Sequence, residues 1–141
     1  MKGRAGIAIL ALAVAACGAP GSSGAAPAPS PGEAPAEGTY QTVEDMRTDV
    51  QSAFILCNVP LKIYDPPVIE GALQQADCRS NVTMVIFEPA DVLASAAALQ
   101  AEADGPLALV VGTNWIISCP SNQNSCEKIQ GVTGGELMVT P

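Results

Sequence analysis

The stretch from residue 18 to residue 39 sets the main limit on what this chain can fold into. Nineteen of its 22 residues are alanine, proline, glycine or serine. Such small side chains form no hydrophobic face, so burial cannot offset the entropy lost on ordering, and we predict a disordered spacer. Its reach is roughly 26 Å as a coil and about 70 Å when fully extended. Residues 40–141 therefore remain for one domain, which at about 100 residues can bury one modest core.

The segment before Cys17 has the pattern of an export signal. Two basic residues precede an apolar run over residues 6–16, which is too short to span a bilayer as a mature helix. The sequence Val14-Ala15-Ala16-Cys17 resembles the lipobox of bacterial lipoproteins. That resemblance implies a signal peptide over residues 1–16, cleavage between Ala16 and Cys17, and acylation of the Cys17 thiol. Two or more acyl chains, such as palmitate, hold a protein stably at a membrane.

The charge of the chain excludes one large class of partners. Six basic and fourteen acidic residues give a net charge of −8, and two of the basic residues lie in the export signal. No basic run with interleaved aromatic residues occurs, so we expect no nucleic-acid binding. We also expect the acidic surface to disfavour direct adhesion to anionic lipid headgroups.

Three segments have helical patterns. Thr42 is a predicted helix cap, followed by an acidic residue three positions later, and the helix is expected to end near Cys57. Its predicted apolar face consists of Val43, Met46, Val50, Ala53 and Phe54. The alanine-rich segment 90–103 has Val92, Leu93, Ala96 and Leu99 on its predicted apolar side. A short third helix is expected over residues 124–130.

Five segments have the pattern of strands. We predict strands at residues 73–79, 82–87, 107–111, 115–119 and 136–140, with the first as a sheet edge. The proline-containing residues 58–72 are expected to be irregular. Gly112-Thr113-Asn114 is a predicted tight hairpin, because glycine and asparagine tolerate positive φ. The fold class is therefore α+β: a sandwich of two to three helices on one mainly antiparallel sheet of four to five strands, ordered α-β-β-α-β-β-α-β.

Four cysteines remain once Cys17 is set aside. An even number in an exported chain predicts two disulfides, with three possible connectivities. The simplest pairs Cys119 with Cys126 across a short polar loop, which leaves Cys57 with Cys78. Zinc binding and thiol exchange are the alternatives, but the cysteines lack the close two-residue spacing that both usually need. We therefore expect no metal or other cofactor.

The layout as a whole resembles uncharacterised small lipoproteins of high-GC Gram-positive bacteria. The shared features are a lipobox, an Ala/Pro/Gly spacer, an early helix ending at Cys57, a second cysteine before an apolar strand, the Gly112–Trp115 hairpin and a late Gly-Gly pair. The resemblance implies the architecture and a location at the outer face of the cytoplasmic membrane. It implies no activity.

Catalytic chemistry finds little support in the sequence. The chain has no histidine, which removes Ser-His and Cys-His nucleophiles and most catalytic zinc sites, and its scattered acids form no obvious pair. We therefore expect a non-enzymatic domain that binds an envelope partner. One alternative is a module for a small molecule or cell-wall fragment, with Trp115 as a ligand contact beside residues 60–67. A partly buried core or hairpin anchor is, however, the more common role of such a tryptophan. The other alternative is a protease-inhibitor-like domain with residues 120–125 as its reactive loop.

Overall fold

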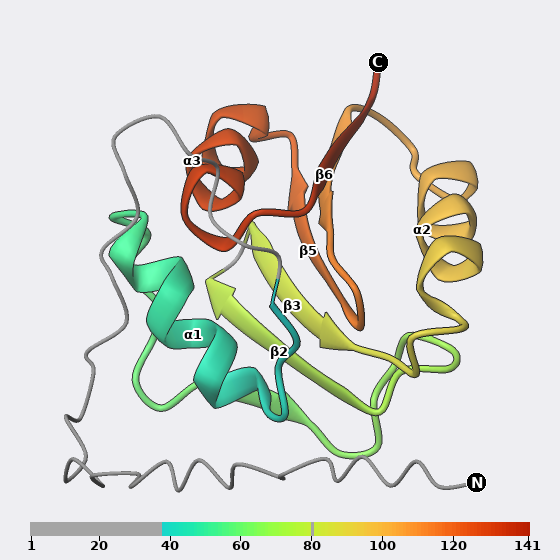
Figure 1. The fold of residues 1–141 in the computed structure, drawn as a ribbon. Helices are drawn as coiled ribbons and strands as arrows, with labels where there is room; N and C mark the ends of the chain where they lie inside the picture. Colours follow the sequence, from blue (N-terminus) through green and yellow to red (C-terminus); the bar gives the residue numbers. More distant parts are fainter. Residues whose placement is uncertain (1–37, 80) are drawn as a thin grey trace, which may run out of the picture.

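The computed structural model describes residues 38–79 and 81–141, so Cys17, the predicted signal peptide and almost all of the predicted spacer lie outside the described residues. The described residues form an α+β domain of three helices and a six-stranded sheet (Figure 1). In chain order the elements are α1 (Val43–Ser52), β1 (Lys62–Tyr64), β2 (Gln74–Arg79), β3 (Val82–Ile86), α2 (Val92–Ala101), β4 (Leu107–Val111), β5 (Trp115–Pro120), α3 (Gln123–Thr133) and β6 (Glu136–Thr140).

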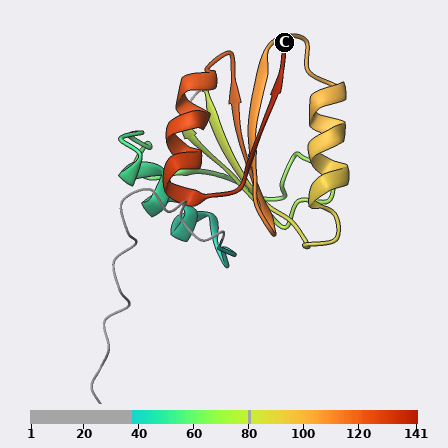
Figure 2. The same ribbon diagram turned by 45° about the horizontal axis from the view of Figure 1, so that its top comes forward.

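The sheet separates two layers of helices. Its strands lie in the order β1-β2-β3-β5-β4-β6, and every neighbouring pair is antiparallel. One core cluster joins α1 and α3 to one face, and a second joins α2 to the other. Figure 2 shows α3 and α2 on opposite sides of the sheet. Because α2 packs mainly on β4 and β5, most of the β1–β3 half of that face has no helix above it.

The predicted α+β class is confirmed, but the sheet has six strands where four to five were expected. The additional strand is β1, within the segment predicted to be irregular. It pairs with β2, so β2 lies inside the sheet and the prediction of an edge strand at 73–79 is wrong. Three residues between prolines carry too short a pattern to reveal a strand, and only the pairing with a distant segment creates it.

Helix α1 begins as predicted and ends earlier. The Thr42 hydroxyl accepts a hydrogen bond from the backbone N–H of Asp45 at 3.1 Å, which caps the first turn. Val43, Met46 and Val50 are buried against the sheet. The helix stops at Ser52, and Phe54, predicted on the buried face, is 91% exposed with φ of +62°. The helical pattern fails there because the chain has already left the helix.

Helix α2 also differs from the prediction in one residue. Val92 and Ala96 are buried and Leu99 packs partly against the same core cluster, but Leu93 is 69% exposed. Each helical residue turns the side chain by about 100°, so only one narrow stripe of the helix faces the sheet. On an alanine-rich helix the sequence does not show how narrow that stripe is.

Candidate functional site

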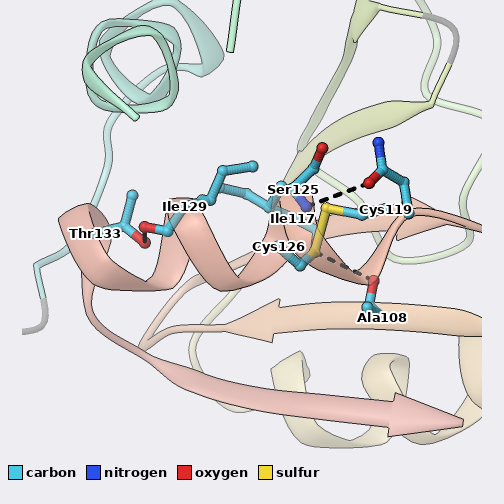
Figure 3. The surroundings of a disulfide bond; sticks show 8 residues. Ala108, Ile117, Cys119, Ser125, Cys126, Ile129 and Thr133 are labelled. Carbon is cyan, nitrogen blue, oxygen red and sulfur yellow. Dashed lines mark hydrogen bonds between the residues drawn. A yellow bond between two sulfur atoms is a disulfide. The ribbon is translucent and has the colours of Figure 1, made fainter. Parts of the chain in front are cut away.

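Both disulfides are present in the structure, as Cys57–Cys78 and Cys119–Cys126. The first ties the chain after α1 to the end of β2, with the two Cα atoms 4.3 Å apart. The second closes the turn from β5 into α3 (Figure 3). The sulfur of Cys126 lies 3.4 Å from the carbonyl oxygen of Ala108; a disulfide sulfur carries no proton, so this is a packing contact. Two disulfides in so small a domain are typical of extracytoplasmic proteins.

The turn closed by the second disulfide is short. Strand β5 runs to Pro120 and α3 begins at Gln123, so only two residues separate them. Asn122 caps the helix, its side-chain oxygen accepting from the N–H of Ser125 at 3.4 Å. Residues 120–125 therefore belong mostly to regular elements and offer no extended reactive loop. The protease-inhibitor alternative loses the feature on which it was based.

Trp115 is fully buried, with 0% of its side chain exposed, which agrees with a core role and contradicts the alternative in which it contacts a ligand. Its ring packs edge-on against Tyr40, with the ring centroids 5.5 Å apart. Its indole N–H donates to the carbonyl of Gly38 at 2.9 Å. Asn114 exchanges two hydrogen bonds with the backbone of Tyr40, at 3.1 and 2.8 Å. The Asn114-Trp115 pair thus holds the point where the chain enters the domain.

Gly112 leaves the space that the Trp115 ring occupies, and we call this close contact the Gly112–Trp115 clamp. The residues with positive φ in the described chain are Gly71, Gly134, Gly135, Phe54 and Ser121, so the predicted positive φ at Gly112 and Asn114 is not observed. A Cβ atom at Gly112 would instead overlap the indole atoms Cε2, Nε1 and Cζ2 of Trp115. The glycine is needed because the tryptophan ring lies directly against the backbone.

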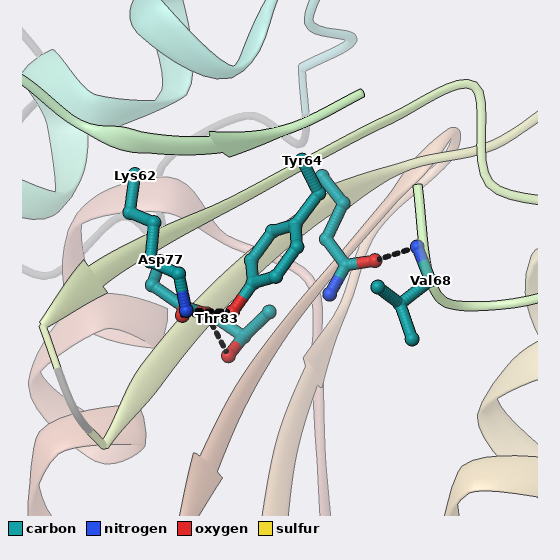
Figure 4. Close-up of polar contacts among 6 residues, drawn as sticks. Lys62, Tyr64, Val68, Asp77 and Thr83 are labelled. Atoms are coloured by element: carbon teal, nitrogen blue, oxygen red, sulfur yellow. Dashed lines mark hydrogen bonds and ion pairs between the residues drawn. The ribbon is translucent and has the colours of Figure 1, made fainter. Parts of the chain in front are cut away.

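A row of polar side chains crosses the half of the sheet that α2 leaves uncovered (Figure 4). Directly opposite residues of an antiparallel sheet share a face, and Lys62, Asp77, Thr83 and Ser118 stand opposite one another along β1, β2, β3 and β5. The Asp77 carboxylate accepts from the Tyr64 hydroxyl at 2.5 Å and from the Thr83 hydroxyl at 2.9 Å. The Lys62 ammonium lies 3.5 Å from the same carboxylate. We call Lys62, Asp77, Thr83 and Ser118 the polar strip.

The lysine of this strip is positioned by its neighbours. Its ammonium donates to the Tyr64 hydroxyl at 2.6 Å and lies 4.5 Å from the centre of that ring. This hydrogen bond raises the pKa of Lys62, so the ammonium stays charged. Tyr64 is itself held by Asp77, which makes the end of β1 a connected hydrogen-bonded group. It offers donors and acceptors to a ligand but no nucleophile with an adjacent base.

A groove runs along α2, on the same side of the sheet as the polar strip. One wall is the turn at residues 68–71, and the other is formed by α2 and its two cap residues and includes Asp91, Ser95 and Glu102. The hollow holds about 740 Å³. The turn is fixed from the sheet, because the Gln75 side-chain oxygen accepts from two backbone N–H groups of this turn, at 2.8 and 3.0 Å. We call this hollow the α2 groove.

The α2 groove continues past the end of the helix. A second hollow of about 520 Å³ shares Leu99 and Glu102 with the first and reaches Ser118 of the polar strip. Carboxylates stand on both walls, Glu70 on the turn and Asp91 and Glu102 on the helix side, and no basic residue lines either hollow. Both hollows are open to solvent. The arrangement suits an extended ligand that carries positive charge or hydroxyl groups.

Other kinds of site find no basis in the part of the chain that the structure describes. No three histidine, cysteine, aspartate or glutamate side chains gather there as metal ligands. Across residues 38–79 and 81–141, no helix combines the length and apolarity needed to cross a bilayer. Comparisons with protein-family models, curated proteins and solved structures found no match for the chain.

Sequence reasoning did not predict the α2 groove or the polar strip. Their residues come from β1, the 68–71 turn, β2, β3, α2 and β5, which are distant in the chain. The only local signal was an imbalance of charge, since residues 80–127 contain no lysine or arginine. That signal marks an acidic region, but only the fold shows that a concave surface lies within it.

Proposed function

We propose that the protein is a lipoprotein, held at the outer face of the cytoplasmic membrane through Cys17, and that its domain is a non-catalytic binding module. The observation that carries the binding role is the α2 groove, an open channel with carboxylates on both walls and no basic residue in its lining. Its ligand is a positively charged, extended segment of another envelope protein. An open acidic groove favours such a segment over a compact apolar molecule, which needs an enclosed apolar pocket.

The lipobox-like sequence at residues 14–17 supports the location, and so does the presence of two disulfides in a small domain. The test is the Cys17→Ala variant, followed by cell fractionation and mass measurement of the mature chain. The variant is expected to leave the membrane fraction or to remain unprocessed. A mature, acylated protein that stays on the membrane without Cys17 would contradict the proposal.

Binding in the groove can be tested with a defined probe. Tetralysine peptide is titrated into the isotope-labelled protein while backbone amide shifts are recorded, and shifts are expected along α2 and residues 68–71. The variant Glu70→Gln/Asp91→Asn/Glu102→Gln should weaken binding at least about tenfold, which corresponds to roughly 1.4 kcal/mol.

The matched control removes three carboxylates that do not line the groove, in the variant Glu44→Gln/Glu127→Gln/Glu136→Gln. It changes the net charge equally and should leave binding within about twofold, because distant exposed charges are screened at physiological salt. Equal weakening by both variants, or shifts spread over the whole surface, would refute a specific groove site.

A second candidate ligand is a hydroxyl-rich cell-wall fragment. The polar strip favours it, because Asp77, Thr83 and Ser118 present carboxylate and hydroxyl groups in a row that leads into the groove. Titration with disaccharide and muropeptide fragments tests this candidate in the same way. Shifts confined to β2, β3 and β5 would favour a fragment over a peptide.

A further inference from the structure

The chain after α1 exposes its apolar side chains to an unusual degree. Phe54, Leu56 and Val59 are 91%, 76% and 79% exposed, the highest values among the large apolar residues of the described chain. Ile55 and Cys57 between them are buried, so Phe54 and Leu56 project outward together while the chain beneath them is fixed in the core. Exposed apolar clusters of this kind mark surfaces that contact a partner or a membrane.

The backbone conformation of Phe54 is also unusual for its residue type. It occupies the left-handed position just after the helix, with φ of +62°, and its N–H donates to the carbonyl of Gln51 at 3.0 Å. Glycine is the usual residue at this position, because a side chain is strained there. A bulky aromatic side chain that is both strained and exposed adds nothing to the stability of the fold, which points to a role outside it.

The exposed side chains are presented by a rigid stretch. The Cys57–Cys78 disulfide and a hydrogen bond from the N–H of Asn58 to the carbonyl of Cys78, at 2.7 Å, tie it to the end of β2. This bond places Asn58 and Val59 beside the exposed Arg79. Arg79 stands opposite Val82, whose side chain is in the core cluster on the α1 side of the sheet. We call Phe54, Leu56, Val59 and Arg79 the apolar–basic face.

Charge distinguishes this face from the rest of the domain. Residues 50–64 contain no acid. The acids of α1, Glu44, Asp45 and Asp49, precede Phe54 by five or more residues, and Glu44 pairs with Arg47. The segment that contains α2 is different, because residues 88–104 include Glu88, Asp91, Glu102 and Asp104 and no lysine or arginine. Since α1 and α2 lie on opposite faces of the sheet, a negatively charged surface repels the α2 side more strongly than it repels the apolar–basic face (Figure 1).

The chain also enters the domain on the α1 side. Tyr40 lies two residues after the first described residue, and its hydroxyl donates to the Asp49 carboxylate at 2.6 Å. Phe54 follows Asp49 by five residues, about one and a half helical turns. A spacer that begins at a lipid on Cys17 therefore reaches the domain near the apolar–basic face.

We infer that the apolar–basic face docks on an anionic lipid surface. Phe54, Leu56 and Val59 enter the headgroup region, Arg79 contacts a lipid phosphate, and the α2 groove faces away from the membrane. The inference rests on the proposed anchoring at Cys17, which holds the domain near that surface. It departs from the expectation that the acidic domain avoids anionic headgroups, because the proposed contact surface is apolar and residues 50–64 contain no acid.

The test places a fluorescent reporter at two exposed apolar positions of the full chain. Phe54→Trp reports on the proposed face, and Leu93→Trp, at a residue 69% exposed on α2, is the matched control. The native Trp115 is fully buried and supplies a constant background. The lipid-bearing proteins are reconstituted into vesicles of phosphatidylglycerol or of phosphatidylcholine, and emission and quenching by brominated acyl chains are recorded.

With phosphatidylglycerol, the emission of Phe54→Trp should move to shorter wavelength and be quenched, whereas that of Leu93→Trp should not change. Arg79→Gln should weaken docking about fivefold, and salt should weaken it further, whereas Lys62→Gln, on the opposite face of the sheet, should leave docking unchanged. Reduced hydrogen exchange over residues 54–59 of the unsubstituted chain checks the result without a reporter.

Equal emission shifts at both positions, or none at Phe54→Trp on vesicles that carry the protein, would overturn docking. A shift without lipid that grows with protein concentration would instead assign the face to a second copy of the chain, and would also overturn it. Flotation of the protein with the vesicles reports on the anchor alone. A protein that floats without a shift thus refutes the docking and leaves the proposed anchoring intact.

Discussion

Replacing Gly112 with alanine is expected to destabilise the domain by about 2–4 kcal/mol. The new methyl group would overlap three atoms of the Trp115 ring, which is fully buried and cannot move outward without displacing its neighbours. Overpacking of this kind costs about 1–3 kcal/mol. Displacing the ring also loses the hydrogen bond from its N–H to Gly38, at 2.9 Å, which contributes about 1 kcal/mol more.

A double-mutant cycle isolates this contact. Trp115→Leu alone should cost about 3 kcal/mol through the cavity it leaves, but it removes the ring that the new methyl would strike. Gly112→Ala should then cost much less in the Trp115→Leu background, with a coupling energy of at least about 1.5 kcal/mol. Urea unfolding, monitored by far-ultraviolet circular dichroism with the disulfides oxidised, measures the free energy of unfolding of the unsubstituted chain, the two single variants and the double variant.

Gly131→Ala is the control for the glycine itself. Gly131 lies inside α3, and a Cβ atom there would meet nothing within 4 Å. This substitution should stabilise the protein by about 0.5–1 kcal/mol, because alanine favours helix. If Gly112→Ala were also neutral, or if the two substitutions of the cycle were additive, the steric account of the Gly112–Trp115 clamp would be refuted.

Three further predictions follow from single residues. Phe54→Gly should raise the free energy of unfolding by about 1 kcal/mol in urea titrations, because glycine adopts the positive φ without strain. The same substitution should weaken vesicle docking. A loss of stability would show that Phe54 packs in the fold. Burial, together with the hydrogen bond to Asp49, raises the pKa of Tyr40 above its ordinary 10.0. Above pH 10 the unfolded chain loses a proton that the folded chain keeps, so stability present below pH 10 should decline as pH rises, and Tyr40→Phe should flatten that decline in pH-dependent unfolding. Replacing Cys57 and Cys78 with alanine opens a loop with a sequence separation of 21 and should lower the free energy of unfolding by about 3.3 kcal/mol. Removing the second disulfide, with a separation of 7, should lower it by about 2.4 kcal/mol. The reverse order in urea titrations would contradict the loop-entropy argument.

The elements that sequence reasoning predicted best are those with a strong local pattern. The strands at 107–111 and 136–140 match the prediction residue for residue, because continuous apolar or β-branched runs between turn residues are self-contained signals. The third helix was placed correctly but is longer at both ends. Strand β1 was missed, and β2 was given the wrong place in the sheet, because pairing partners lie far apart in the chain.

In the candidate site, too, the sequence revealed the local pattern but not the contacts between distant segments. The sequence shows that residues 80–127 contain acids but no lysine or arginine. The groove, however, exists only where the 68–71 turn lies against α2. Trp115 was weighed as either a core residue or a ligand contact, and the sequence alone did not decide between them. Burial of the ring against Gly38 and Tyr40 decided it, since the environment of a side chain depends on segments that arrive from elsewhere.

The sequence by itself determined the α+β class and the even set of four cysteines, and it predicted the extent of the domain and a lipid on Cys17. These depend on composition and local pattern, whose physical causes act over a few residues. Tertiary structure alone decided the strand order, the hydrogen bond from Trp115 to Gly38, the α2 groove and the exposure of Phe54. Each of these depends on which distant surfaces come into contact, and a local pattern carries no information about that.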